Sequence, residues 1–177
     1  TAEEVGEQII FSPNARYKKP WRARFTSIFV AHASDDKPRI RPIVEALLEA
    51  GFQIWIDKPH KLDLDSRLAK RMRGLQFGVG DWKEQIRNAA RRANIVLVFW
   101  SDDAIDARRD HFYYEVYMGL MQRKLWQCRI ASVSTLKIGR PFTFDQIADL
   151  SNFKTGHYHP ELDLVIEELP RFKPRTW

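Results

Sequence analysis

Apolar and polar residues alternate along the chain in blocks that predict strands followed by helices. Residues 28–31 are apolar on both faces, which is typical of a central strand in a parallel sheet with helices on each side. Residues 37–50 carry apolar side chains at the spacing of one helix face, and Gly51 is placed to end that helix. Asp35 and Asp36 are placed to cap its start.

The same strand and helix unit is repeated further along the chain. Residues 52–56 predict a short strand, and Asp81 with Glu84 three positions later has the spacing of a capping box at a helix start. The remaining expected elements are a strand at 95–100, a helix at about 109–124, a weaker strand around 130–133 and a last helix at 161–169.

This alternation of strands and helices predicts an α/β fold. We expect a flavodoxin-like three-layer sandwich, in which a parallel sheet of about five strands is flanked by helices. Ligands of such sheets bind at the carboxyl ends of the strands. In this chain those ends lie at 33–36, 57–61 and 101–103, so polar residues there are the first candidates for a site.

An enlarged loop is expected after the second strand, at 58–81. A connection of that length exceeds the usual two to six residues between a strand and its helix. Apolar residues within it recur near helical spacing, and Gly78 and Gly80 allow a hinge. The segment is either a mobile lid over a pocket at the strand ends or a tolerated surface insertion.

Composition narrows the class of protein. The 177 residues are 44% hydrophobic and 29% charged, which is enough to build the core of one domain. We expect a basic arm or linker at 1–25, the domain at 26–170 and a tail at 171–177. The net charge of +6 favours anionic partners of any kind.

The single cysteine, Cys128, excludes an internal disulfide and favours a reducing, cytoplasmic setting. No apolar stretch reaches the roughly 18 residues of a membrane helix, so no membrane contact is expected. The chain begins at Thr1 rather than at methionine, which suggests a piece of a longer protein.

Most strong signatures of catalysis are missing. The chain has no G-x-G-x-x-G, no Walker loop, no zinc-spaced cysteines and no H-E-x-x-H. His157 and His159 precede Pro160 as in a loop before a helix, so no metal is expected. Three arginine pairs lie on separate elements without an interleaved aromatic stripe, so direct nucleic-acid binding is not expected either; they are Arg71/Arg73, Arg91/Arg92 and Arg108/Arg109.

Two pairs of acidic residues directly follow predicted strands, namely Asp35/Asp36 and Asp102/Asp103. Helix capping explains both pairs, because aspartate accepts hydrogen bonds from free backbone N–H groups. Their position at the carboxyl ends of strands keeps ligand binding open as the alternative.

Five segments, in order, resemble the Toll/interleukin-1 receptor (TIR) domain family of the bacterial kind, and together they cover about 26–169. They are the opening strand and loop at 27–36, the second strand at 51–57, the next helix start at 80–82 with Ile86, the third strand at 96–101 and the segment HFYYE at 111–115. The last is similar to the helix that carries the catalytic glutamate in enzymatic members.

The resemblance implies that the chain splits NAD+ at the bond between nicotinamide and ribose. The products would be nicotinamide and ADP-ribose or a cyclic form, with NAD+ as the substrate and no separate cofactor. Glu115 carries over as the catalytic residue. The positions similar to the family's substrate cleft and lid junction are Ser34, Asp35, Asp57 and Trp82.

The chain departs from the family pattern in two places. Many active relatives carry a substrate-stacking tryptophan four residues before the glutamate, where this chain has His111. Phe112 and Tyr113 are the candidate replacements. The insertion after Asp57 is also longer than in animal members, as is common among bacterial effectors.

The chemistry is compatible with a single carboxylate. Nicotinamide leaves as a neutral molecule and needs no acid, so Glu115 can act by stabilising the positive charge that develops on the ribose. Gly119, one turn later, would leave room for a substrate. The alternative is an ordinary helix glutamate that pairs with His111.

By resemblance, the partners are other TIR domains and a fused or associated sensor domain. The expected role is the effector part of a bacterial immune or anti-phage protein that oligomerisation activates. The alternative is a non-catalytic scaffold that only pairs with other TIR domains.

Overall fold

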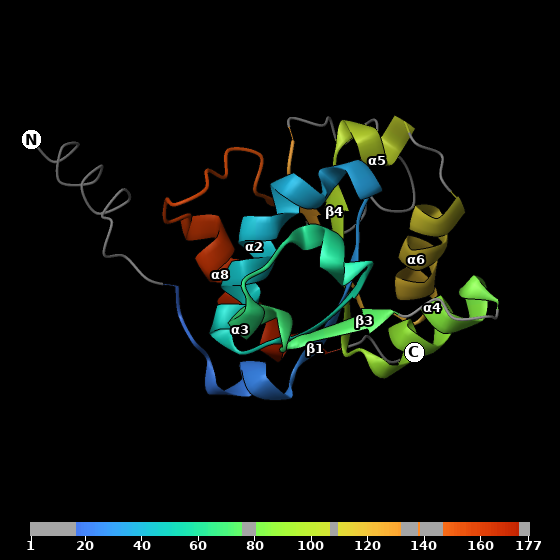
Figure 1. Ribbon diagram of the computed structural model, residues 1–177, viewed down its shortest axis with the longest axis horizontal. Coiled ribbons are helices and arrows are strands. Elements are labelled where there is room, and N and C mark those ends of the chain that lie inside the picture. Colours follow the sequence, from blue (N-terminus) through green and yellow to red (C-terminus); the bar gives the residue numbers. More distant parts are fainter. Residues whose placement is uncertain (1–16, 76–80, 107–109, 132–137, 139–146, 174–177) are drawn as a thin grey trace, which may run out of the picture.

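A parallel β-sheet forms the centre of the computed structural model, which describes residues 17–75, 81–106, 110–131, 138 and 147–173 (Figure 1). Within these residues the sheet has six strands in the order β3-β2-β1-β4-β5-β6, and every pairing is parallel. The strands are β1 Ser27–Ala31, β2 Gln53–Asp57, β3 Met72–Leu75, β4 Ile95–Trp100, β5 Leu125–Arg129 and β6 Ile147–Asp149.

Helices cover both faces of this sheet, so the expected three-layer α/β fold is confirmed (Figure 1). One face is covered by α2 (Lys37–Ala50), α3 (Ser66–Ala69) and α8 (Pro160–Glu168), and the other by α4 (Trp82–Arg92) and α6 (Asp110–Met121). The shorter elements are α5 (Asp102–Asp106) and the 3-10 helices η1 (Trp21–Phe25), η2 (Ser34–Asp36), η3 (Pro59–Leu62) and η5 (Leu169–Arg171). In the described part of the chain, none of the helices has the length and apolar character to cross a membrane.

The central strands are buried from both sides, which explains their continuous apolar sequence. On β1, Ile28 and Val30 pack toward α2 and α8, whereas Phe29 and Ala31 pack toward α4 and α6. All of β4 is buried as well. A strand with helices on each face has no polar side, so its sequence does not alternate.

The described part of the insertion after β2 is built into the domain. It contains η3, α3 and then β3, which pairs with β2 and adds an edge strand to the sheet. Leu62 and Leu68 are buried in the core beside α2. The two glycines proposed as a hinge, Gly78 and Gly80, lie outside the described residues.

Two predicted elements near the end of the sheet are corrected by the structure. The helix ends at Met121 and the next strand, β5, occupies Leu125–Arg129 rather than 130–133. The cause is local, because Arg123 adopts a left-handed φ of 58° and turns the chain at once into the strand. The edge strand β6 was not expected from the sequence.

The described part of the N-terminal arm packs against α8. The Tyr17 hydroxyl accepts a hydrogen bond from the backbone N–H of His159 (3.1 Å). The backbone N–H of Lys18 donates to Asp163 Oδ1 (2.7 Å), and Ala23 is fully buried in the core. Residues 17–25 are therefore held in place ahead of β1.

Candidate functional site

Buried polar side chains gather near the carboxyl ends of the central strands. His32 follows β1, Lys37 begins α2 and Glu115 lies on α6, and these three side chains are 7%, 4% and 5% exposed. Asp57 ends β2 and is half-buried. Removing ionisable groups from water costs free energy unless they are paired or neutral, so this arrangement constrains the charge of each group.

Glu115 is the most strongly perturbed acid of this group. Burial raises its pKa well above the usual value, the negative charge of Asp57 raises it further, and the positive charge of Lys37 opposes both effects. Asp57 lies on the same sheet face as Trp55, which packs toward α4 and α6, because alternate strand residues share a face. Glu115 and Asp57 therefore face one region, and both burial and the charge of Asp57 shift Glu115 toward its protonated form.

Lys37 brings a positive charge to the same region. Its Nζ lies 2.8 Å from Nε2 of His32. Burial, and then the charge of Lys37, lower the pKa of His32 to about 3, so at neutral pH the imidazole is uncharged and accepts a hydrogen bond from the ammonium. Burial lowers the pKa of Lys37, whereas Asp57 and Glu115 raise it. One cation thus faces two carboxyl groups.

Asp57 has unused hydrogen-bonding capacity. Its Oδ1 is buried and makes no hydrogen bond within the part of the chain that the structure describes. A buried acceptor without a donor is uncommon in folded proteins. Asp57 is therefore ready to accept a hydrogen bond from a ligand hydroxyl.

An aromatic pair lies one helical turn before Glu115. The rings of Trp82, at the start of α4, and His111, on α6, are stacked with centroids 3.6 Å apart and an interplanar angle of 21°. Tyr114 packs edge-on against Trp82 at 5.8 Å. His111 and Glu115 are four residues apart and so share a helix face. A tryptophan from α4 thus lies next to His111 on the helix face that carries Glu115.

The neighbouring aromatic residues of α6 are differently placed. Phe112 is 3% exposed and packs edge-on against Trp100, with ring centroids 5.5 Å apart. Tyr113 packs against Phe112, and its hydroxyl donates to the Ile105 carbonyl (3.3 Å). Phe112 is therefore a core residue, and we do not retain it as a substrate-binding candidate.

The polar residues of the loop after β1 differ in burial and in their contacts. Ser34 and Asp35 are exposed on η2, close to the buried group. Asp36 is fully buried and accepts a hydrogen bond from the Ser101 hydroxyl. It makes no side-chain cap at α2, contrary to the sequence expectation. Ser101 in turn accepts from the Ala104 N–H (3.0 Å), so this network connects the ends of β1 and β4.

Gly119 does not create space for a ligand, as the sequence suggested. A Cβ atom at this position would lie 2.7 Å from Cβ of Val96 and 2.9 Å from Cδ1 of Leu125. The glycine instead lets α6 approach the sheet closely. Its role is in packing.

Sequence reasoning missed two members of the buried group, His32 and Lys37. His32 interrupts an apolar run at a strand end, which is the one local signal available. Lys37 follows two aspartates at a helix start and looks like a solvated charge. Their contact depends on the turn through η2, which neither residue reveals alone.

The histidine directly before the last helix, His159, helps to form the start of that helix. His159 Nδ1 accepts a hydrogen bond from the Leu162 N–H (3.4 Å) and so caps α8. Its Nε2 lies 2.6 Å from Asn152 Oδ1. These two contacts give His159 a structural role at the start of α8.

Comparison with known proteins gives one match. The sequence model of the TIR domain family matches residues 28–154. No curated protein matches the chain. The matched range includes the whole buried group and the stacked rings, and it leaves out η1 and α8.

Proposed function

This chain belongs to the TIR domain family, and on that premise we propose that it is an NAD+ glycohydrolase with Glu115 as the catalytic residue. The observation that carries the proposal is the position of Glu115. Its carboxyl group is buried on α6 and shares the ligand-binding edge of the sheet with Asp57 and Lys37. Strongly perturbed acids in such positions are favoured candidates for catalysis.

The proposed reaction breaks the bond between C1′ of the nicotinamide ribose and the ring nitrogen. The bonding electrons leave with nicotinamide, which departs neutral, so no proton donor is needed. Positive charge then develops on the ribose, and the carboxylate of Glu115 stabilises it. A water molecule adds to C1′ and releases its proton, which gives ADP-ribose, or an internal nucleophile closes a cyclic product.

The buried state of Glu115 suits a cationic substrate. In the free protein, burial and Asp57 favour the protonated form, because both raise the pKa of Glu115. The positively charged nicotinamide ring would favour the ionised form, as any nearby cation does. Glu115 would then lose its proton as NAD+ binds, and the anion would form where the ribose charge develops.

The other residues have proposed roles in holding NAD+. The unpaired Oδ1 of Asp57 would accept a hydrogen bond from a ribose hydroxyl. The stacked rings of Trp82 and His111 would form the wall of the cleft in place of a single tryptophan. Ser34 and Asp35 would contact the substrate at the exposed mouth of the site.

We propose further that the chain is the effector part of a bacterial immune or anti-phage protein. In this scheme an associated sensor domain brings TIR domains together, and NAD+ cleavage follows their oligomerisation. The net charge of +6 is compatible with attraction of the NAD+ pyrophosphate.

Chromatography of NAD+ incubated with concentrated protein tests the proposal. The parent should release nicotinamide and Glu115→Ala should not, and the second product peak identifies ADP-ribose or its cyclic form. Glu84→Ala is the matched control, because it removes an exposed glutamate from α4. Equal nicotinamide release by parent and Glu115→Ala would exclude Glu115 as the catalytic residue.

A scaffold that only pairs with other TIR domains is the second candidate. It is favoured by one observation, the presence of His111 where active relatives carry a stacking tryptophan. A scaffold should self-associate in sedimentation experiments, show no NAD+ cleavage and be indifferent to Glu115→Ala.

A further inference from the structure

Two exposed aromatic rings lie together on η1, near the amino end of β1. The buried polar residues around Glu115 lie near the other end of the strands. Trp21 is 65% exposed and Phe25 is 64% exposed, with ring centroids 6.0 Å apart. Arg22 lies over the Trp21 ring (5.4 Å to the centroid), and Arg24 lies over the Phe25 ring (4.8 Å). We call residues 18–25 together with 167–171 the basic-aromatic surface.

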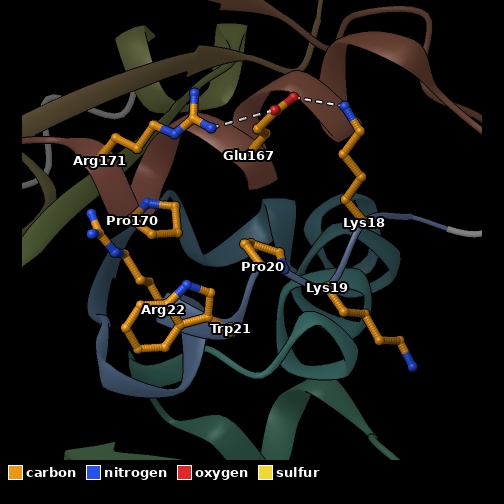
Figure 2. A pocket seen from close by; sticks show the side chains of 8 residues that line it. All are labelled: Lys18, Lys19, Pro20, Trp21, Arg22, Glu167, Pro170 and Arg171. Atoms are coloured by element: carbon orange, nitrogen blue, oxygen red, sulfur yellow. Dashed lines mark hydrogen bonds and ion pairs between the residues drawn. The ribbon is translucent and has the colours of Figure 1, made fainter.

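A hollow of about 590 Å³ borders the Trp21 ring, and Phe25 lies beside Trp21 outside its lining (Figure 2). Its volume lies within the range of ligand sites. Figure 2 shows Lys18 and Arg171 reaching Glu167 from either side, with N–O distances of 2.6 and 3.7 Å. Glu167 is therefore neutralised by its neighbours. The charged residues that line the hollow are Lys18, Lys19, Arg22, Arg171 and Glu167, so four cations surround one anion.

The cations beside the rings are available to a ligand. Among the described residues, no carboxylate lies within ion-pair distance of Lys19, Arg22 or Arg24. The backbone that carries them is fixed, because the Thr26 hydroxyl donates to the Arg22 carbonyl (3.0 Å) and Ala23 is buried. Preorganised rings and cations lose less conformational entropy when they bind.

We propose that the basic-aromatic surface binds single-stranded nucleic acid, with bases stacked on Trp21 and Phe25 and phosphates held by Lys19, Arg22 and Arg24. The chemistry fits this class of ligand, because a nucleotide strand presents flat rings and anionic groups in alternation. Proteins that bind single strands combine aromatic platforms with a positively charged groove in the same way. An acidic peptide would satisfy the cations but would leave both exposed rings without a flat partner.

This surface is distinct from the site proposed for NAD+. It lies outside residues 28–154, which the TIR family model matches. It also lies near the amino ends of the strands, because η1 directly precedes β1. Asp57 lies at the other end of the strands, as the last residue of β2, which runs parallel to β1. The inference therefore stands or fails independently of NAD+ cleavage.

Nucleic-acid binding at this surface was not expected from the sequence. The arginine pairs on other elements lacked interleaved aromatic residues and gave no reason to expect nucleic-acid binding. On η1 the sequence WRARF does interleave them, and the structure places both rings on the exposed side of one short helix. A sequence interpreted as a linker gave no basis for that arrangement.

Fluorescence anisotropy with a labelled oligo(dT) of about 12 nucleotides tests the proposal on the full chain. Trp21→Ala should weaken binding by about five-fold or more, because one stacking partner is lost. Leu164→Ala is the control, since it removes another exposed apolar side chain, and it should bind as the parent does. Circular dichroism of each variant checks that the fold is intact.

The cations are tested by the salt dependence of binding between about 50 and 200 mM. Arg22→Gln with Arg24→Gln should reduce the slope of log affinity against log salt by about 1.4, or about 0.7 for each lost phosphate contact. Arg91→Gln with Arg92→Gln removes the same charge from the exposed face of α4 and should leave the slope unchanged. Equal losses from both pairs would overturn the proposal, because net charge alone would explain them.

Competition experiments distinguish binding of single-stranded nucleic acid from binding of other anionic ligands. Poly-glutamate, which has charge without bases, should compete poorly with the oligonucleotide, and so should free NAD+. Equally strong competition by poly-glutamate or by NAD+, or tight binding to anionic vesicles without oligonucleotide binding, would overturn the proposal. Glu115→Ala should bind the oligonucleotide as the parent does, whatever its effect on NAD+.

Discussion

Replacing His32 with glutamine should make the stability of the domain less sensitive to acid. His32 is buried and held beside the Lys37 ammonium, with Nε2 and Nζ 2.8 Å apart. Burial and the Lys37 charge lower the pKa of His32 from its usual 6.5 to about 3. In His32→Gln the side-chain oxygen can still accept from Lys37, but the group no longer takes up a proton.

The direction of this pH effect follows from the different pKa values of His32 in the folded and unfolded chains. As the pH falls below about 6.5, the unfolded chain protonates His32 and the folded chain does not, so the folded state loses stability. At pH 5 the medium lies about 1.5 units below the unfolded pKa, which corresponds to roughly 2 kcal/mol at about 1.4 kcal/mol per unit. The loss continues until the pH reaches about 3.

Urea unfolding at about pH 7.5 and pH 5 measures this effect. The parent should lose roughly 2 kcal/mol more than His32→Gln between the two pH values, because other titrating groups are common to both proteins. His60→Gln is the control, since it removes an exposed histidine on η3 and should lose as much as the parent. If His32→Gln and the parent lose the same free energy, His32 is not held neutral in the folded protein.

Three other changes test the packing and the proposed site. Gly119→Ala should destabilise the fold by about 1–3 kcal/mol in urea unfolding, because its Cβ would lie 2.7 Å from Cβ of Val96; an unchanged midpoint would show that α6 can move away from the sheet. Glu115→Gln should gain stability relative to the parent as the pH rises above about 4.5, and this gain should be lost again as the pH falls. The raised pKa of Glu115 means that the parent loses stability as the pH rises, so a constant difference would contradict a buried, protonated acid. If NAD+ is cleaved, His111→Ala should raise the KM for NAD+ by about two- to ten-fold through loss of the stack on Trp82, and an unchanged KM would remove His111 from the site.

The sheet could be predicted from sequence where strands are buried on both faces. Residues 28–31 of β1 and all residues of β4 are apolar, which is the pattern of strands covered by helices on both faces. The edge strands β3 and β6 are short and lack such an apolar run, so neither strand could be predicted from its own residues. Their formation depends on pairing with β2 and β5 rather than on their own residues.

The candidate site was predictable in part. Glu115 and Asp57 were identified through the family resemblance, and the structure brings them to one region. Which aromatic residue lies near Glu115 depends on how α6 is rotated against the sheet, and this orientation buries Phe112 and pairs His111 with Trp82. The spacing of residues within α6 does not show that His111 packs against Trp82, because Trp82 belongs to α4.

The contact between His32 and Lys37 illustrates what sequence patterns omit. The two residues are five positions apart, and the turn through η2 brings their nitrogen atoms to 2.8 Å. A lysine after two aspartates at a helix start is normally solvated. Its burial here results from the close approach of α2, β2 and α6, which is a tertiary effect.

The most direct test of the central proposal is nicotinamide release by protein held at high density on a surface. Parent and Glu115→Gln would be captured at equal density on vesicles, and nicotinamide would be followed over time by chromatography. If Glu115 cleaves NAD+, the parent releases nicotinamide at a rate that rises with density. Glu115→Gln, which keeps the shape of the side chain but not its charge, releases none. Absence of release from the densely captured parent, or equal release from both proteins, would contradict NAD+ cleavage by Glu115.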